Sequence, residues 1–446
     1  MKLCLTEGMR AALPVLNLLQ NQGYEAVFVG GAVRDLLLER PVNDIDIATS
    51  ARPEEVMKLF PKCIPTGLQH GTVTVLLEGA SYEITTFRRE AAYEHYRKPS
   101  EVSFIRDLDG DLLRRDFTMN AMAAQADGTL YDPYQGRGDL LAKKLRCVGA
   151  AETRFQEDAL RMLRAIRFIG SYRLTPALSA WRALRKHRPL LKFIAMERVE
   201  AELSKMLESD ETLRGLTWLA ASRLLEHTKE PIFDRKSLSK LLYWQRRRAY
   251  PYRKRDGDIE ANRFAMLNEL SQGEDKLVCM ILLLELDESA TIRIAEALRF
   301  SKGRKAFLLS VWRIHESMLK TNGEAEEALN ERWRECVLRF GEEACLVWLR
   351  LFPIVKGKID TETSEYSIGR FGSMLEQMPI KQLKELNVNG SELSNFLGRP
   401  AGPWMKALLQ TLLRMAASGR LPNEKIALLT FAEKWNEQKQ GEDNDE

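Results

Sequence analysis

The first 150 residues and the remainder of the chain differ in the spacing of their hydrophobic positions. Before residue 150, short runs rich in β-branched and aromatic residues are punctuated by glycines, and such runs are typical of strands. Helical patterns lie between them at about 9–22 and 53–60, where Pro53 and two glutamates suit a first turn. We therefore expect a compact α/β domain with strands at 26–29, 44–48, 72–77 and 82–87.

From residue 150 onward the strand pattern nearly disappears. Between Asp158 and Ile169, hydrophobic residues recur at mixed spacings of three and four, which predicts a helix. Similar patterns predict helices at 203–207, 237–242, 276–286, 304–318 and 405–417. The acidic residues 441–446 are expected to form a solvated tail. The predicted fold class is α+β, with a mixed-sheet domain at 1–150 and all-helical parts at 151–220, 221–310 and 311–440.

Composition excludes several classes of protein. The chain has 446 residues, of which 45% are hydrophobic and 29% charged, so it has enough apolar material to form cores. No apolar run approaches the roughly 18 residues of a membrane span, and the first residues lack the long apolar stretch of a signal peptide. The six cysteines form no CxxC pair, so neither a disulfide scaffold nor a structural zinc site is expected, and a reducing cytoplasm is the predicted location.

The distribution of charged residues along the chain says more about possible ligands than the net charge does. The net charge is only +4, but residues 154–205 hold 12 Lys and Arg against 5 Asp and Glu, an excess of 7. A second basic stretch, 246–255, is interleaved with aromatic residues. Basic and flat aromatic side chains suit a phosphate backbone and unstacked bases. A solvated helix face with a few packed rings explains the same pattern, and both interpretations stay open.

The densest group of candidate functional residues lies between 30 and 46. Gly30 and Gly31 follow a predicted strand, and the backbone N–H groups of such a turn can hold a triphosphate, to which Arg34 can add a charge-assisted contact. Asp44 and Asp46 lie on one face of a predicted strand. Paired carboxylates without a nearby His or Cys favour Mg²⁺ over zinc, and a two-metal site of this kind activates a hydroxyl and stabilises leaving pyrophosphate.

Two further motifs combine acidic and basic residues. Arg114 and Arg115 precede Asp116, which suits either a structural ion pair or guanidinium contacts with phosphate or ribose. Asp158 and Arg161, three residues apart in a predicted helix, share a face and can pair with each other. An ordinary surface salt bridge accounts for that spacing. So does a polar edge of acceptors and donors that hydrogen-bonds the Watson–Crick face of a base.

These motifs, in this order, resemble those of the class II tRNA nucleotidyltransferases, the bacterial CCA-adding enzymes, whose head is related to that of poly(A) polymerases. GGAVRDLLL…DIDIAT is similar to the metal motif of the family, LLRRDFTMNAMA to its ribose motif, and EDALRMLRAIRF to its nucleotide-template motif. Residues 132–148 resemble the hinge, 197–205 the motif that buttresses the neck, and 390–404 part of the tail. The chain departs from the family at Glu39, where Gly is usual, and at Ser391-Glu392, where the family usually has Asp.

The resemblance implies a polymerase-β-like catalytic head (1–150), a helical neck that selects nucleotides (151–220), a body (221–310) and a tRNA-binding tail (311–440). It implies an enzyme that adds C, C and A to the 3′ end of tRNA from CTP and ATP, releasing pyrophosphate, with Mg²⁺ as cofactor. Residues 88–99 match a flexible loop of members that add the final A. The implied site residues are Asp44, Asp46 and Glu83 for catalysis, the first two binding metal, and Gly30, Gly31, Arg34, Arg114, Arg115, Asp116, Asn120, Asp158, Arg161 and Arg164 for nucleotide binding.

Several alternatives stay open at this stage. Within the family, a partial enzyme adds only A, or only CC. A bacterial poly(A) polymerase shares the head motifs, and a non-catalytic RNA-binding protein can share the scaffold, although the intact Asp44 and Asp46 argue against it. The partners expected are tRNA, through its acceptor arm and elbow, CTP and ATP, and no membrane. The chain is either a monomer or a homodimer.

Overall fold

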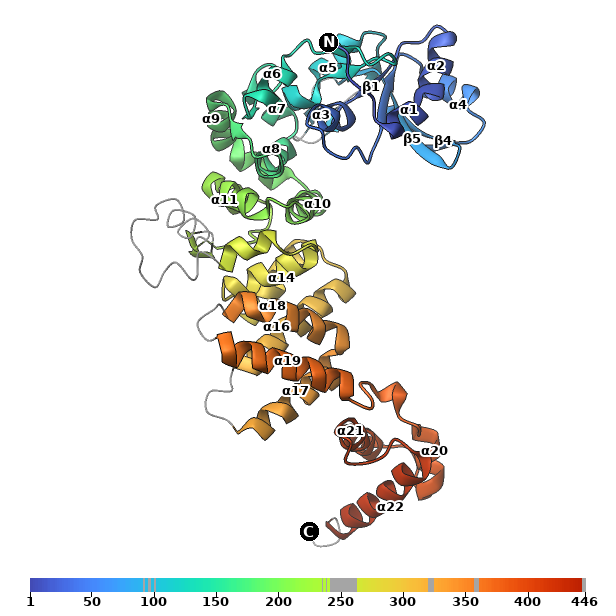
Figure 1. Ribbon diagram of the computed structural model, residues 1–446, viewed down its shortest axis with the longest axis vertical. Coiled ribbons are helices and arrows are strands. Elements are labelled where there is room, and N and C mark those ends of the chain that lie inside the picture. Colours follow the sequence, from blue (N-terminus) through green and yellow to red (C-terminus); the bar gives the residue numbers. More distant parts are fainter. Residues whose placement is uncertain are drawn as a thin grey trace. The chain divides into compact units, whose positions relative to one another are not determined.

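The computed structural model describes residues 1–90, 93–94, 98–99, 102–234, 236–237, 239–240, 263–319, 325–356 and 361–442. Two compact units make up the chain (Figure 1). The first comprises Met1–Arg246 with Ala297–Arg299, and the second comprises Arg247–Glu296 with Phe300–Glu446. The features predicted at 88–99, 237–242, 246–255 and 441–446 lie wholly or partly outside the described residues. The division into four parts stays a prediction.

A mixed sheet of seven strands forms the head and confirms the predicted fold class. Its order is β11-β10-β1-β2-β5-β4-β3, and only β2 and β5 are parallel neighbours. The strands are β1 (Ala26–Val29), β2 (Asp46–Thr49), β3 (Cys63–Gly67), β4 (Thr72–Leu77), β5 (Ala80–Thr86), β10 (Ala123–Ala124) and β11 (Leu130–Tyr131). Three short ladders accompany the sheet: β6 (Arg88–Glu90) with β9 (Val102–Phe104), β7 (Tyr93–Glu94) with β8 (Lys98–Pro99), and β12 (Lys144–Leu145) with β13 (Thr175–Pro176).

Short helices cover this sheet, and apolar side chains of β1, including Val27 and Val29, pack with Leu112 of α5 in a buried cluster. The single helix predicted at 9–22 is two helices, because Pro14 lacks the N–H that would continue the first one. The helices are α1 (Glu7–Ala11), α2 (Leu13–Asn21), α3 (Gly31–Leu37), α4 (Pro53–Leu59), α5 (Leu108–Leu113) and α6 (Gly136–Leu141), with single 3-10 turns η1 (Leu68–His70) and η2 (Thr118–Asn120).

Helices α7 to α11 follow the head in the same unit. Helix α8 packs against α10 and α11, and at α11 the approach is close: a Cβ atom on Gly170 would lie 2.8 Å from the Cα atom of Gly215. The predicted helix at 158–169 begins two residues later than expected, since Asp158 has extended backbone. The elements are α7 (Ala151–Glu157), α8 (Leu160–Ser171), α9 (Leu178–His187), η3 (Arg188–Phe193), α10 (Met196–Leu207), α11 (Thr212–Ser222) and η4 (Leu224–Glu226).

The described residues of the second unit are helical, as predicted. Trp333, Trp348 and Phe371 form a buried aromatic cluster in it, with ring centroids 5.0–6.5 Å apart. No helix in the described ranges is long and apolar enough to cross a membrane. The elements are η5 (Met266–Asn268), α14 (Gly273–Leu283), α15 (Glu288–Ala297), α16 (Lys302–Leu319), α17 (Glu326–Phe340), α18 (Glu342–Lys356), α19 (Thr361–Gln377), η7 (Leu383–Glu385), α20 (Gly390–Leu397), α21 (Pro403–Ala417) and α22 (Lys425–Glu442).

The two departures from the family pattern have local structural explanations. Glu39 has a φ of 53°, in the left-handed region that favours glycine. It follows α3, where the N–H of Arg40 bonds the carbonyl of Asp35, as in a Schellman motif. Glu392 lies in the first turn of α20, and its carboxylate accepts the backbone N–H of Asn389 as half of a capping box.

Candidate active site

A cavity of about 790 Å³ in the first unit is lined by residues of the head sheet, α8 and α10. All the site residues predicted from the sequence line this cavity except Asp44. Its lining is strongly basic, which favours a polyanionic ligand such as a triphosphate. The basic side chains are Arg34, Arg88, Arg114, Arg115, Arg161, Arg164, Arg167, Arg198 and His70, and the acidic ones are Asp46, Glu83, Asp116 and Asp158.

The turn between β1 and α3 brings backbone close to the carboxylates. Gly30 has a φ of 67°, and a Cβ atom there would lie 3.0 Å from Nη1 of Arg115 and 3.6 Å from Oδ2 of Asp46. A side chain at Gly30 would therefore be both strained and crowded. Glycine at this position lets a ligand approach the backbone beside Asp46.

Asp46 and Glu83 are neighbours on the parallel strands β2 and β5, directly in register. Burial raises the pKa of the Asp46 carboxyl; nearby Arg115 opposes this, and the negative charges of Glu83 and Asp44 add to it. Asp44 is exposed and precedes the strand, which begins at Asp46 rather than at Asp44 as predicted. Asp44 and Asp46 therefore do not lie on one face of the same strand, although the negative charge of Asp44 acts on Asp46.

This donor set fits a divalent cation held partly by substrate. In the described part of the chain, no group of three or more His, Cys, Asp or Glu side chains is arranged to enclose a metal ion. The oxygens of Asp46, Asp44 and Glu83 are the hard ligands that Mg²⁺ prefers, and Mg²⁺ commonly takes only one or two carboxylates beside water and substrate phosphate. A cation there would also offset the burial and the negative charges of Glu83 and Asp44, which together raise the pKa of Asp46.

Arg114 and Arg115 are both anchored on the buried Asp111. Arg114 donates to Oδ1 of Asp111 at 2.7 Å, and Arg115 donates to Oδ2 at 3.2 Å. Burial works against ionisation of Asp111, but the two guanidinium groups hold its pKa below the ordinary value. The Nε atom of Arg115 is buried and has no hydrogen-bond partner within the described residues. An anionic oxygen in the cavity would supply that partner.

Asp116 joins the head to α8. Its Oδ1 accepts the N–H of Phe117 and the Nδ2–H of Asn120, at 2.8 and 3.0 Å, while Oδ2 accepts Nε–H of Arg164 at 2.8 Å and forms an ion pair with the same guanidinium group, 2.7 Å from Nη2. Although burial opposes ionisation, Arg164 and these hydrogen bonds lower the pKa of Asp116 to about 2. Asp116 thus holds Asn120 and Arg164 in place from inside the protein.

Arg34 is fixed on every side of its guanidinium group. It donates to both carboxylate oxygens of Asp35, at 3.0 and 2.7 Å, and to Oδ1 of Asn120 at 2.7 Å. Its guanidinium carbon also lies 4.4 Å from the ring centroid of Tyr172 and 5.4 Å from that of Phe168. Arg34 therefore links α3 to α8 while still lining the cavity.

Asp158 and Arg161 both line the cavity but do not pair with each other as the helical spacing predicted. Asp158 lies between α7 and α8, where its Oδ1 accepts the N–H of Leu160 and its Oδ2 accepts Nη2 of Arg198 at 2.8 Å. Arg161 instead donates to Glu157 at 2.6 Å and to the carbonyl of Arg114 at 3.1 Å. Both residues thus line one cavity, but the pairing between them that the helical spacing predicted is wrong.

Sequence reasoning did not place Arg198, Asp111, Arg167 or His70 at the site. Arg198 falls in the stretch 197–205 that was assigned only to buttressing the neck, and no local spacing connects it with Asp158, which lies 40 positions earlier. Asp111 carries a usable signal, since it precedes Arg114 and Arg115 by three and four residues in a helical segment.

Comparisons with known proteins agree with this architecture. Residues 26–146 match the family model "Poly A polymerase head domain", residues 174–235 match "Probable RNA and SrmB-binding site of polymerase A", and residues 269–432 match tRNA nucleotidyltransferase domain 2. The CCA-adding enzyme of Geobacillus sp. (strain WCH70) is 37% identical, over 94% of this chain and 95% of the relative. That of Bacillus cereus (strain B4264) is 34% identical, over 94% and 96%.

A solved structure gives the same result. The crystal structure of the Bacillus stearothermophilus CCA-adding enzyme in complex with CTP matches with a TM-score of 0.80 at 31% identity, covering 98% of this chain and all of that one. The fold and the cavity thus define a nucleotidyltransferase. The chain belongs to the CCA-adding enzyme family, the tRNA nucleotidyltransferases, whose chemistry uses a divalent metal. The resemblance, fold class and enzyme class predicted from the sequence are confirmed.

Proposed function

We propose that this chain adds C, C and A in succession to the 3′ end of tRNA, taking CMP from CTP and AMP from ATP and releasing pyrophosphate. Family membership supports the reaction, and the CTP complex of a relative supports the nucleotide. The observation that carries the proposal is that one cavity is lined both by two carboxylates, those of Asp46 and Glu83, and by two further polar side chains, Asp158 and Arg161.

The carboxylates would serve the chemical step. Asp46 and Asp44 would hold Mg²⁺, with Glu83 beside them as a further acceptor. When bound, Mg²⁺ lowers the pKa of the attacking 3′-hydroxyl and stabilises pyrophosphate as it leaves. Asp46 is the first residue of β2 and lines the cavity, so its carboxylate would lie beside a nucleotide bound there.

The arginines would hold the triphosphate. Arg115 lies beside Gly30 and Asp46 and has an unpartnered buried Nε, so a phosphate oxygen at the β1–α3 turn can accept from it. Because Asp111 fixes Arg114 and Arg115, binding the phosphate costs little side-chain entropy. Asn120, held by Asp116 and Arg34, would contact the ribose.

Asp158 and Arg161 would choose the base without a nucleic-acid template. A carboxylate accepts the amino group that cytosine and adenine share, and a guanidinium donates to the ring nitrogen beside it. Uracil and guanine carry a carbonyl in place of that amino group. Their carbonyl oxygen and the Asp158 carboxylate, both hydrogen-bond acceptors, would then face each other without a proton between them. The same acceptor–donor edge therefore fits C and A and rejects U and G.

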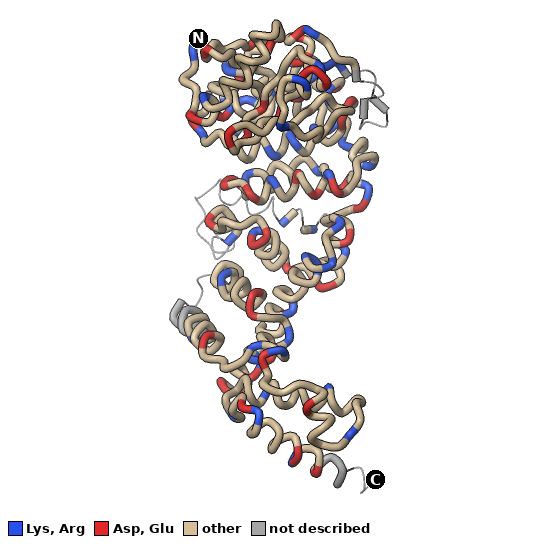
Figure 2. Tube along the Cα trace, turned by 90° about the vertical axis from the view of Figure 1, so that its right-hand side faces the viewer, with Lys and Arg blue, Asp and Glu red and all other residues tan. Residues whose placement is uncertain are grey.

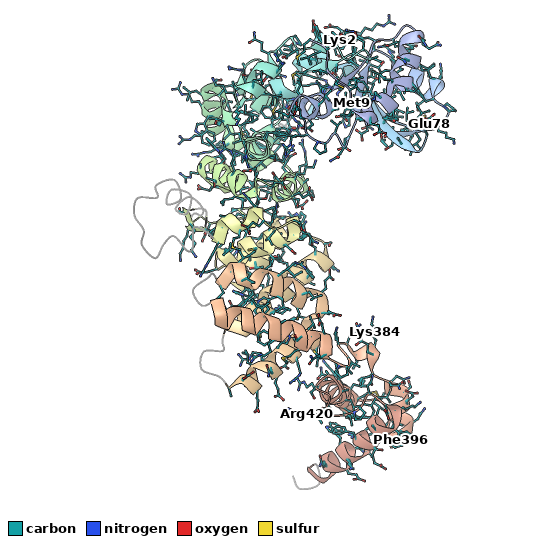
Figure 3. The ribbon with its side chains drawn as sticks, viewed as in Figure 1. Lys2, Met9, Glu78, Lys384, Phe396 and Arg420 are labelled. Carbon is teal, nitrogen blue, oxygen red and sulfur yellow. The ribbon has the colours of Figure 1, made fainter. Side chains whose placement is uncertain are left out.

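Transfer RNA would be bound through its phosphates by the basic residues of 154–205 and by the second unit. Figure 2 shows acidic residues interspersed among the basic ones along the trace, so selective phosphate contacts fit better than one continuous basic stripe. In the second unit, Figure 3 labels Phe396 of α20 and Arg420, which follows α21. Phe396 is exposed, and Arg420 pairs with Glu331. Contacts with the tRNA phosphates carry little sequence information, which suits an enzyme that serves many tRNAs.

Three tRNA acceptors test the proposed function. Transcripts that end before CCA, after CC and after CCA are each incubated in Mg²⁺ with CTP, with ATP or with both. We expect the first to gain CCA with both nucleotides, the second to gain one A, and the third to stay unchanged. Growth of an A tract on all three would assign a poly(A) polymerase instead. Addition of A alone, or of CC alone, would assign a partial enzyme.

A further inference from the structure

Asp158 and Arg161 do not pair with each other, and each is held by an ion-pair partner of its own. Arg198, on α10, reaches Asp158 with Nη2 at 2.8 Å and Nη1 at 3.4 Å. Glu157, at the end of α7, accepts Nη1 of Arg161 at 2.6 Å. Helices α8 and α10 pack together (Figure 1). Arg198 lies near the start of α10 and lines the cavity.

This arrangement keeps Asp158 and Arg161 from neutralising each other. Residues three apart at a helix start are close enough to pair, and an Asp158–Arg161 pair would use the same atoms that a base must reach. Arg198 binds both oxygens of Asp158, and Leu160 N–H binds Oδ1 at 3.1 Å. Oδ2 therefore keeps an open lone pair, in a fixed direction, for a further donor.

Resting on the function proposed above, we infer that Arg198 is a positioning residue for nucleotide selection. It holds the Asp158 carboxylate turned away from Arg161 and open to the amino group of cytosine or adenine. Without Arg198, the carboxylate is free to turn toward Arg161, or toward Arg164, on which it already acts electrostatically. The acceptor would then no longer be aligned with the donor, and U and G would be rejected less strongly.

A purely structural role for Arg198 predicts a different outcome. The Asp158 and Arg198 side chains are 15% and 32% exposed, so the pair is partly solvated and adds modestly to stability. If stability were its whole contribution, the loss of Arg198 would reduce incorporation of all nucleotides alike. A positioning role instead changes the ratio between nucleotides, and only while Asp158 is present.

The test measures kcat/KM for CTP and for UTP on a tRNA that ends before CCA. We expect Arg198→Met to lower the CTP-over-UTP ratio about tenfold, the scale of one lost base-edge contact. Arg198→Lys, which keeps the charge but not the two-point contact, is expected to recover part of the ratio. In an Asp158→Ala background, Arg198→Met is expected to leave the ratio unchanged.

Arg173→Met is the matched control, because Arg173 pairs with Glu211 in the same unit and does not line the cavity. Its ratio should equal that of the wild type. An unchanged ratio in Arg198→Met, or an equal drop with and without Asp158, would overturn the positioning role while leaving the proposed function intact. Failure of the wild-type chain to prefer CTP over UTP would instead overturn the proposed function itself.

Discussion

Replacing Asp116 by Asn should destabilise the first unit in a way that depends on pH. Asp116 is buried, accepts three hydrogen bonds, one of them from Arg164, and forms an ion pair with the Arg164 guanidinium group. An Asn side chain has the same shape, but its NH₂ group would face either the N–H donors of Phe117 and Asn120 or those of Arg164. Arg164 would then lose its main counter-charge, and breaking a buried pair typically costs about 3–5 kcal/mol.

Part of this cost can be assigned to ionisation. The pKa of Asp116 falls from 3.8 to about 2 on folding, and each unit corresponds to about 1.4 kcal/mol, so ionised Asp116 contributes about 2 kcal/mol. Because the pKa in the folded state is the lower one, this stability is fully present above pH 3.8. It is lost as the pH falls toward 2, and about 1 kcal/mol of it is gone by pH 3.

Urea unfolding of the wild-type and Asp116→Asn chains between pH 7 and pH 3 measures this difference. The gap in unfolding free energy should be about 3 kcal/mol or more at pH 7 and should narrow by about 1 kcal/mol at pH 3. Other carboxylates titrate in both proteins and cancel in the difference. A gap that stays constant from pH 7 to pH 3 would refute the ionised Asp116–Arg164 link.

Three further predictions concern the catalytic carboxylate, the tRNA and the turn after α3. Asp46→Ala should lower incorporation of CMP about a thousandfold in Mg²⁺ while leaving tRNA affinity unchanged in a filter-binding assay, and near-normal turnover would remove Asp46 from the metal site. The tRNA affinity should fall at least about tenfold between 50 and 200 mM salt and differ little among tRNA species; a salt-independent affinity would contradict phosphate-based binding. Glu39→Gly should raise the unfolding free energy by about 0.5–1 kcal/mol, because φ at Glu39 is 53°; a lower urea midpoint would contradict this.

Local patterns in the sequence were sufficient for much of the head. The strands at Ala26–Val29 and Thr72–Leu77 have the predicted bounds, because short β-branched runs between glycines have few other stable conformations. The strand at 44–48 was placed two residues too early. Alternation alone cannot show where inter-strand hydrogen bonding begins, and here pairing begins at Asp46, against Glu83.

At the site, features set by neighbouring residues could be predicted from the sequence, whereas pairs between residues far apart in the chain could not. Gly30 could be predicted, since a strand followed by two glycines and a helix requires a tight turn. The pairs Asp116–Arg164 and Asp158–Arg198 join residues 48 and 40 positions apart. They depend on how α8 packs against the head and how α10 packs against α8, which periodicity does not encode. The helical spacing rule therefore paired Asp158 with Arg161, its neighbour in sequence.

The most direct test of the whole account is the 3′ sequence that the wild-type chain builds on a tRNA ending before CCA, with all four nucleoside triphosphates present at equal concentration. We expect sequencing of the products to find CCA, and nothing beyond it, on nearly every extended molecule. Products that carry U or G at these positions as often as C or A would contradict selection by Asp158 and Arg161, and an extended A tract would contradict the proposed function.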